Sequence, residues 1–299
     1  MGRQPRGEWR ELASEIAKRL PRGYLHFRTE RLGDDAVAII AVYRGNAPPP
    51  VDPFDVGHRH VTVRTKIVVD ALVAPRHFDG VYAGAAIVAD LGGGKREYGA
   101  ICAFVAPPGQ PQPTHAVTCG HMFPAGAIGC GVLGGTGNPQ PIGTLWQNFL
   151  DAADPRDVAL VELNGYGQAC VANGGPGPKL VDYLPDDQIF GLTCKSYRPT
   201  IANYSQATTT AISSTSAHVS STLRPDGFDL EDVIATIAEV SISGDSGTVL
   251  ATTDEPIAIG SCSASGGRQS LFEPIGRALD EIIRPHFSLQ FWKSPFGPD

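Results

Sequence analysis

The sequence has few charges and no long apolar segment, and both features exclude classes of protein. Charged residues make up 18% of the 299 positions, and the longest apolar runs, such as 36–42 and 85–89, have the length of a strand. A helix that spans a membrane needs about 18 or more apolar residues, so no membrane segment is expected. Residues 1–20 carry charges throughout and lack an apolar stretch before a cleavage site, so no signal peptide is predicted. These absences favour a cytoplasmic protein.

Positive charge and closely spaced cysteines are also scarce. The chain has 24 Lys and Arg against 31 Asp and Glu, a formal charge of −7. A negative chain without a basic stripe repels a phosphate backbone, so nucleic acid is not an expected partner. The six cysteines are never closer than 11 positions, which excludes the short spacing of structural zinc sites. We therefore expect no metal or other cofactor, and six free thiols in a reducing compartment.

Glycine and proline are abundant, with 35 Gly and 25 Pro, which is typical of a turn-rich, mainly β protein. A helix is predicted over 9–20, and extended runs follow at 23–28, 35–44 and 60–70. We interpret residues 1–78 as a small N-terminal α/β module. The apolar residues at helical spacing are Trp9, Leu12, Ile16 and Leu20.

From residue 80 onward, short β-type runs are interrupted by Gly and Pro, at 82–88, 98–105, 115–119, 142–146 and 158–163. Such runs are too short and too frequent for βαβ units and favour antiparallel barrels or sandwiches. A Gly/Pro/Asn stretch at 173–178 is typical of a linker. A second β-rich set follows over 180–263, in which we predict the Ser/Thr-rich stretch 205–222 to be strand. A helix is predicted over 272–283, ending before Pro285.

Three short segments carry residues typical of a hydrolase: Thr118-Cys-Gly-His121, Asp157-Val-Ala-Leu160 and Gly244-Asp-Ser-Gly247. A serine hydroxyl is a weak nucleophile and needs a base, and the ordinary pKa of histidine suits that task. A buried carboxylate can then hold the second ring nitrogen of the base. The three segments together predict Ser246 as nucleophile, His121 as base and Asp157 as the acid that orients it.

Each segment alone also has an ordinary structural explanation. A histidine at a strand end is usually structural, and Gly-Asp-Ser-Gly is a common turn composition. If the turn is catalytic, its glycines allow the backbone N–H groups of Gly244 and Ser246 to point at the same place. There they would stabilise the negatively charged oxygen that forms during the reaction. Cys119 could in principle be a thiolate nucleophile, but it lies on the same strand as the base, so packing is its predicted role.

The order His, Asp, Ser along the chain excludes the α/β-hydrolase and subtilisin orders. With these motifs, residues 80–285 resemble the chymotrypsin/trypsin-like serine proteases, and specifically bacterial members that are made in active form, since no Ile-Val-Gly-Gly activation site is present. The resemblance implies two antiparallel six-stranded β-barrels with a C-terminal helix, preceded here by the N-terminal module. The first barrel, 79–172, would carry His121 and Asp157, and the second, 173–299, would carry Ser246.

The same resemblance implies a set of substrate-binding residues: Val240, Ser241, Cys262, Ser263 and Ser265. Residues 257–265 would pair with the substrate backbone, and Ser263 would be hydrogen-bonded near Asp157. Trypsin-type members have an Asp where this chain has Val240, so a small or apolar residue before the cut is expected. The partner of the buried carboxylate of Asp245 is not identified by the sequence.

The predicted function is a serine endopeptidase that acts through a His-Asp-Ser triad and an acyl-enzyme intermediate. Its partners would be protein or peptide substrates, and a regulatory protein partner is a further hypothesis, because an unrestrained protease would harm the cell. Two alternatives stay open at this point. One is a non-catalytic trypsin-fold module that binds a protein, and the other is an esterase or acyl transferase that uses the same triad.

Overall fold

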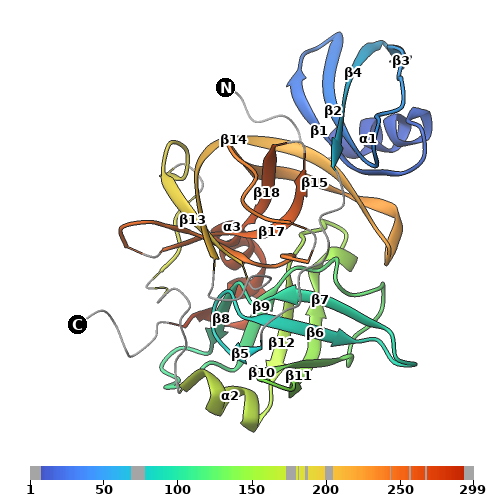
Figure 1. Ribbon diagram of the computed structural model, residues 1–299. Coiled ribbons are helices and arrows are strands. Elements are labelled where there is room, and N and C mark those ends of the chain that lie inside the picture. The colour runs from blue at the N-terminus through green and yellow to red at the C-terminus, as the bar shows by residue number, and fades with distance from the viewer. Residues whose placement is uncertain are drawn as a thin grey trace.

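The computed structural model describes residues 8–68, 78–172, 180, 182–185, 188–198, 205–242, 244–255, 257–266 and 268–292. Strands dominate these ranges, as Figure 1 shows, which confirms the expected mainly β class. Among the described residues, no helix is both long and apolar enough to cross a membrane. All six cysteines are free, as predicted.

One sheet has nine strands, eight of them in the order β19-β8-β9-β12-β11-β10-β6-β7, while β5 pairs with β10. The chain between β7 and β8 joins the two sides of this sheet, because Ile101 N donates to Ala85 O and Cys102 N donates to Val117 O. A single bent segment therefore pairs with β6 in its first half and with β9 in its second. The strands are β5 (Asp79–Gly80), β6 (Ala86–Asp90), β7 (Arg96–Ala100), β8 (Ala103–Ala106), β9 (His115–Thr118), β10 (Gly131–Thr136), β11 (Gln140–Asn148), β12 (Ala159–Leu163) and β19 (Gln290–Phe291).

The second sheet has ten strands in the order β13-β16-β17-β18-β15-β14-β1-β2-β4-β3, and β13 also pairs with β14. That extra pairing closes β13, β16, β17, β18, β15 and β14 into a ring. The strands are β1 (Tyr24–Leu32), β2 (Ala36–Arg44), β3 (Phe54–Val56), β4 (Arg59–Val68), β13 (Thr193–Arg198), β14 (Ser205–Ser221), β15 (Arg224–Thr236), β16 (Val249–Thr252), β17 (Ala258–Gly266) and β18 (Gln269–Pro274).

The Ser/Thr-rich stretch is strand β14, as predicted, and it is long enough to serve two neighbours. Its first part pairs with β13, while Ala217, His218 and Val219 pair with β1. The N-terminal strands thus extend the sheet that contains the ring of six strands, and Figure 1 shows them beside the β14–β15 hairpin. The division into 1–78, 79–172 and 173–299 stays a prediction, and the 173–178 linker lies outside the described residues.

Helix α1 (Glu8–Arg19) covers one face of the N-terminal strands, close to the predicted range 9–20. Trp9 and Ile16 on the helix pack against Phe27 and Ile39 on β1 and β2, all of them buried. Burying each such side chain contributes about 1.5–3 kcal/mol. The helical spacing of apolar residues in the sequence was sufficient to predict this helix.

The C-terminal helix differs from its predicted range of 272–283. Strand β18 extends to Pro274, and three helical segments follow without a break: α3 (Ile275–Ala278), a π-helical turn η3 (Leu279–Ile283) and α4 (Arg284–Phe287). The helix passes through Pro285 because the π turn has already interrupted the regular hydrogen-bond ladder, so little is lost where proline has no N–H. Two further elements were not predicted, η1 (Phe149–Asp151) and α2 (Gly165–Ala172).

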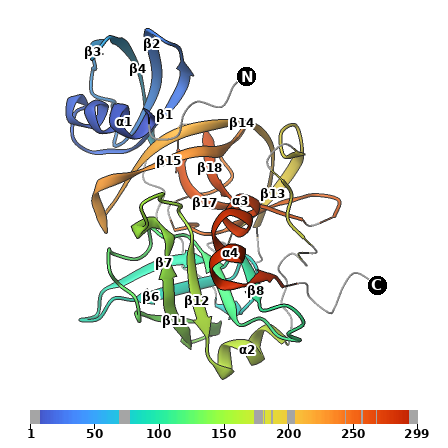
Figure 2. The same cartoon turned by 180° about the vertical axis from the view of Figure 1, so that it is seen from behind.

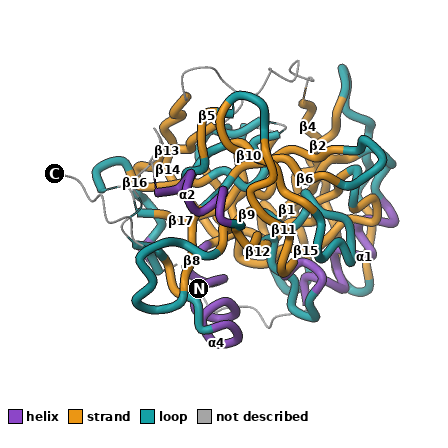
Figure 3. The backbone as a smooth tube through the Cα atoms, turned by 90° about the horizontal axis from the view of Figure 1, so that it is seen from below, coloured by secondary structure: helices purple, strands orange, loops and turns teal. Residues whose placement is uncertain are grey.

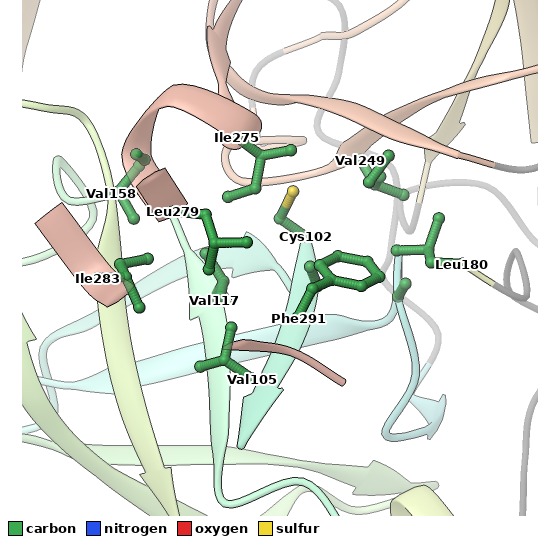
Figure 4. Close-up of a cluster of buried hydrophobic side chains, with 14 of the residues drawn as sticks. Cys102, Val105, Val117, Val158, Leu180, Val249, Ile275, Leu279, Ile283 and Phe291 are labelled. Carbon is green, nitrogen blue, oxygen red and sulfur yellow. The ribbon is translucent and has the colours of Figure 1, made fainter. Parts of the chain in front are cut away.

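A buried apolar cluster joins the two sheets behind the site described below. Figure 4 shows Val105 and Val117 of the first sheet facing Ile275 and Leu279 of the C-terminal helix, with Val249 of the second sheet beside them. Seen from behind in Figure 2, α3 and α4 lie across the boundary between the sheets. Figure 3 shows α1, α2 and α4 as short helices that lie apart from one another. Close packing of this cluster fixes the distance between loops that come from different sheets.

Candidate active site

His121 follows β9 by three residues and is held by close backbone packing. A Cβ atom on Gly120 would lie 2.5 Å from Asn148 Oδ1, so only glycine fits before the histidine. Asn148 Nδ2 in turn donates to Gly120 O at 3.0 Å. Thr118 Oγ1 donates to Ala100 O at 2.7 Å, which fixes the end of the strand. His121 itself is only 9% exposed.

Asp157 lies two residues before β12, and sheet pairing brings it to His121. Ala159 pairs with Thr118 across β12 and β9, so the residues just outside both strand ends are neighbours. The carboxylate is fully buried and both of its oxygens are used. Oδ1 accepts the backbone N–H of His121 at 2.9 Å, and Oδ2 lies 2.8 Å from His121 Nδ1. One oxygen therefore fixes the backbone and the other fixes the ring.

Ser246 occupies the turn before β16 and is fastened to both sheets. Ala100 N donates to Ser246 O at 2.7 Å, and Gly247 N donates to Cys262 O at 2.8 Å. A Cβ atom on Gly247, whose φ is +81°, would lie 2.5 Å from Ala100 O. The turn can approach the first sheet this closely only because residue 247 is glycine.

The structure brings the three side chains into one continuous chain of hydrogen bonds. His121 Nε2 lies 2.8 Å from Ser246 Oγ, on the opposite side of the ring from Asp157. An ionised carboxylate only accepts, so Nδ1–H donates to Asp157 and Nε2 accepts from the Ser246 hydroxyl. Burial lowers the pKa of His121, but the carboxylate of Asp157 outweighs it and holds that pKa well above the ordinary 6.5. The ring is thus both oriented and made more basic.

The turn around Ser246 presents backbone N–H groups to the same space. Asp245 N donates to Ile242 O and Gly247 N donates to Cys262 O, whereas, within the described part of the chain, the N–H groups of Gly244 and Ser246 donate to no carbonyl. Gly244 has a φ of +96°, a conformation that glycine adopts without strain. One partner of the buried Asp245 carboxylate is now identified, because Ile242 N donates to its Oδ2 at 2.9 Å.

The site opens into a groove of about 1060 Å³. His121, Ser246 and Gly244 line it, together with Cys262 and Ser263 from β17. The far wall comes from the N-terminal strands, where the lining residues include Tyr24, His26, Arg44 and Lys66. The groove therefore runs from the three side chains to the N-terminal strands, which precede the nine-stranded sheet and the ring of six strands in the sequence.

Only some of the predicted substrate-binding residues line the groove. Cys262 and Ser263 line the groove, whereas Val240 and Ser241 are 1% exposed and do not line it. Ser241 Oγ donates to Ser270 Oγ at 2.7 Å, which draws it into the protein interior, and Ile242 lines the groove instead. Ser265 pairs with Ser270 on β18, and its side chain lies outside the described part of the structure.

The hydrogen bond expected from Ser263 toward Asp157 is not formed. Ser263 Oγ is buried without a hydrogen-bond partner. The prediction relied on the resemblance alone, and the Asp157 carboxylate already binds His121 through both of its oxygens. The orientation of His121 thus depends on Asp157 and on packing rather than on Ser263.

Phe228 is a residue of the site that the sequence analysis missed. It belongs to β15, and its ring stacks on that of His121 with centroids 6.0 Å apart and an interplanar angle of 17°. No local motif marks this position, because the contact depends on the long β14–β15 hairpin reaching the first sheet. The aromatic ring excludes water from one face of the imidazole and restricts its rotation.

Cys119 lies beneath the site, with its Sγ 3.8 Å from His121 Nε2. Burial raises the pKa of this thiol, and the residue packs in the apolar core of the first sheet, as predicted. Cys119, His121 and Asp157 are the metal-ligand types that come together here. A single ion does not fit them, because Asp157 faces Nδ1 of the ring while Cys119 faces Nε2, on opposite sides.

Comparisons with known proteins give structural similarities only. No protein-family model matches the sequence, and a search of curated proteins finds no match. The chain is similar to solved structures of a glutamic acid specific serine protease (TM-score 0.46, 18% identity, covering 70% of this chain and 99% of the other) and of Thermobifida fusca Protease A (0.47, 18%, 71% and 98%). It is also similar to Cellulomonas bogoriensis chymotrypsin (0.45, 18%, 72% and 98%).

Proposed function

We propose that this chain is a serine endopeptidase in which Ser246, His121 and Asp157 act together. The observation that carries the proposal is the unbroken hydrogen-bonded chain from Asp157 Oδ2 through both ring nitrogens to Ser246 Oγ, with 2.8 Å at each step. These distances are within the range for proton transfer between a nucleophile and its base. The three side chains come from two different sheets, so local turn formation does not account for their meeting.

The proposed reaction begins when Ser246 Oγ attacks the carbonyl carbon of the peptide bond and His121 Nε2 takes the hydroxyl proton. The carbonyl oxygen becomes an oxyanion, which the N–H groups of Gly244 and Ser246 would bind, each contributing about 3 kcal/mol. The protonated ring then gives its proton to the leaving amine, and the acyl group stays on Ser246 as an ester. A water molecule, deprotonated by His121, hydrolyses the ester and restores the hydroxyl.

Strand β17 supports the proposal because it offers an open edge to an extended substrate. Gly260 and Ser261 pair with both β16 and β18, whereas among the described strands residues 264–266 pair only with β18. Ser263 and Ala264 line the groove on this side. An unpaired strand edge binds an extended peptide through backbone hydrogen bonds. A substrate that adds to this edge would lie across Ser246.

The preference for a small or apolar residue before the cut remains part of the proposal. Ile242, Cys262 and Ala264 line the groove around Ser246, and these side chains are apolar or nearly so. Val240 is buried in an apolar cluster rather than exposed as the floor of a charged pocket. In this proposal the substrates are proteins or peptides, and control by a regulatory protein partner stays a hypothesis.

The test is covalent labelling with a fluorophosphonate, followed by hydrolysis of a peptide library. We expect the wild-type protein to be labelled and to cleave peptides, and Ser246→Ala to lose both, with a rate at least about 10⁴-fold lower. Ser220→Ala is the matched control, since Ser220 lines the same groove from β14. Labelling that survives in Ser246→Ala would overturn the proposal. Labelling without peptide cleavage would favour an esterase, and neither activity would favour a non-catalytic binding module.

A further inference from the structure

The sheet formed by the N-terminal strands has two very different faces. Phe27, Ile39 and Ala41 point to the face that α1 covers, where they pack with the buried apolar residues of the helix. Because side chains alternate along a strand, the residues between them point to the opposite face.

Basic residues occupy the opposite face in register. His26 on β1 pairs with Val42 on β2, which pairs with Lys66 on β4. One step along the same face, Arg28 pairs with Ile40, and Ile40 pairs with Arg64. Arg44, two residues beyond Val42, also points this way. Five basic side chains, those of His26, Arg28, Arg44, Arg64 and Lys66, therefore lie on one face of this sheet, in a chain whose formal charge is −7. Arg64 is exposed and pairs with Glu30 at 2.8 Å, so we call the other four, His26, Arg28, Arg44 and Lys66, the basic face.

The basic face borders the groove that contains the proposed nucleophile. His26, Arg44 and Lys66 line the same groove as Ser246. Arg268, at the turn between β17 and β18, also lines it, and Glu97 and Glu239 are its acidic lining residues. Cations thus outnumber carboxylates in the lining, and they are concentrated on the wall away from the triad.

Two members of the basic face are buried and have side-chain nitrogens that make no hydrogen bond. His26 is 1% exposed and Arg28 is 2% exposed, yet both ring nitrogens of His26 and both terminal nitrogens of Arg28 make no hydrogen bond. Leaving a buried donor unsatisfied costs about 1–3 kcal/mol, and more for a charged group. Burial, with the charge of Arg28 beside it, lowers the pKa of His26 to about 3. A carboxylate brought to this place would supply the missing acceptors.

We propose that the basic face binds a carboxylate of the polypeptide substrate, at a distance from the bond that is cut, and thereby selects chains that carry an acidic group there. The inference rests on the proposed function, and it assigns to the N-terminal module the role of an additional substrate-binding wall. The carboxylate belongs either to an Asp or Glu side chain or to the chain terminus. Both are carboxylates, and the experiment below distinguishes a side-chain carboxylate from the one at the chain terminus.

The experiment compares peptides of about ten alanine-rich residues, each labelled at the N-terminus. One series carries a single Glu at each position in turn with an amidated C-terminus, a second carries Gln at the same positions, and a third peptide has no acidic side chain but a free C-terminal carboxylate. Cleavage by the wild-type protein gives kcat/KM, and fluorescence anisotropy gives binding to Ser246→Ala. We expect Glu at one or two adjacent positions, or the free terminus, to improve both values about tenfold over the neutral peptide.

The variant Lys66→Met combined with Arg44→Met should lower the ratio of kcat/KM for the acidic peptide to kcat/KM for the neutral peptide by at least about five-fold. The matched control is Arg64→Met, on the same strand and face, since Arg64 is exposed, pairs with Glu30 at 2.8 Å and does not line the groove. Arg64→Met should change neither kcat/KM nor the affinity measured by anisotropy.

The outcomes separate this inference from the proposed function. Two results would overturn the inference alone. One is cleavage that depends on Ser246 but prefers neither Glu over Gln nor a free over an amidated C-terminus, and the other is a preference that Lys66→Met with Arg44→Met leaves intact. Loss of the preference in Arg64→Met to the same extent would also overturn it, because the effect would then be general charge. If the protein cleaves no peptide, the anisotropy data on Ser246→Ala still decide whether the basic face binds a carboxylate.

Discussion

Replacing Asp157 by asparagine tests the geometry of the proposed triad with almost no change in shape. Oδ1 of Asp157 accepts the backbone N–H of His121, so an asparagine would keep its carbonyl oxygen in that place. Its NH₂ group would then face His121 Nδ1, where Oδ2 now lies at 2.8 Å. Because NH₂ only donates, the ring must move its proton to Nε2, and Nε2 can no longer accept the proton of Ser246.

The expected loss is about 10⁴-fold in kcat, equivalent to about 5 kcal/mol in the barrier. The assay is cleavage of a fluorogenic peptide across a pH range, with the rate of fluorophosphonate labelling as a second readout. The carboxylate of Asp157 is what raises the pKa of His121 against its burial. The acid limb of the remaining activity should therefore shift to lower pH.

Asp154→Asn is the matched control for this variant. It makes the same chemical change three residues earlier in the chain, at a side chain that is 61% exposed. The control should keep the wild-type rate, and both variants should unfold at similar temperatures, because the backbone hydrogen bond to residue 157 is retained. A rate for Asp157→Asn within about tenfold of wild type would refute the role assigned to this carboxylate.

Three further predictions concern pH and packing. Cleavage should increase as the pH rises through the folded-state pKa of His121, which lies well above 6.5, and a pH–rate profile with its acid limb below pH 6 would contradict this. Burial raises the pKa of Glu273 from 4.5 to about 7. The folded state therefore binds this proton more tightly than the unfolded state does, and the resulting contribution to stability is complete below pH 4.5 and decreases as the pH rises from 4.5 to 7. The loss is about 3 kcal/mol, and Glu273→Gln should flatten the pH dependence of urea unfolding over that interval, unlike wild type. Gly247→Ala should lower the free energy of unfolding by at least about 2 kcal/mol and reduce labelling of the adjacent serine, because its Cβ would meet Ala100 O at 2.5 Å and Thr118 Oγ1 at 2.6 Å. Wild-type stability and labelling in that variant would show that the turn does not need glycine.

The sequence predicted the parts of the site that depend on residues next to strand ends. His121 and Asp157 each lie two or three residues outside a strand, and the pairing of β9 with β12 is enough to bring them together. Ser246 was recognised from the glycines that flank it. In each case the chemistry requires a residue type within a short motif, and a single sequence displays such a motif directly.

The features that the sequence did not predict depend on contacts between distant segments. Phe228 contacts His121 only because β14 and β15 form a long hairpin that extends to the first sheet. The residues around Phe228 do not indicate how far that hairpin extends. The groove wall at His26 and Lys66 requires β1 to pair with β14, nearly 200 positions away in the chain. Val240 was expected in the pocket by alignment to a motif, but its backbone N–H donates to Ser270 Oγ at 3.0 Å, which holds the residue in the interior.

The most direct measurement of the central claim is the mass of the fluorophosphonate adduct and its position by peptide mapping, in wild type and in His121→Ala. The structure predicts one adduct, on Ser246, which forms rapidly at neutral pH in wild type and at least about 10³-fold more slowly when the imidazole is absent. An adduct on another residue, or labelling of Ser246 at the same rate in both proteins, would contradict the account.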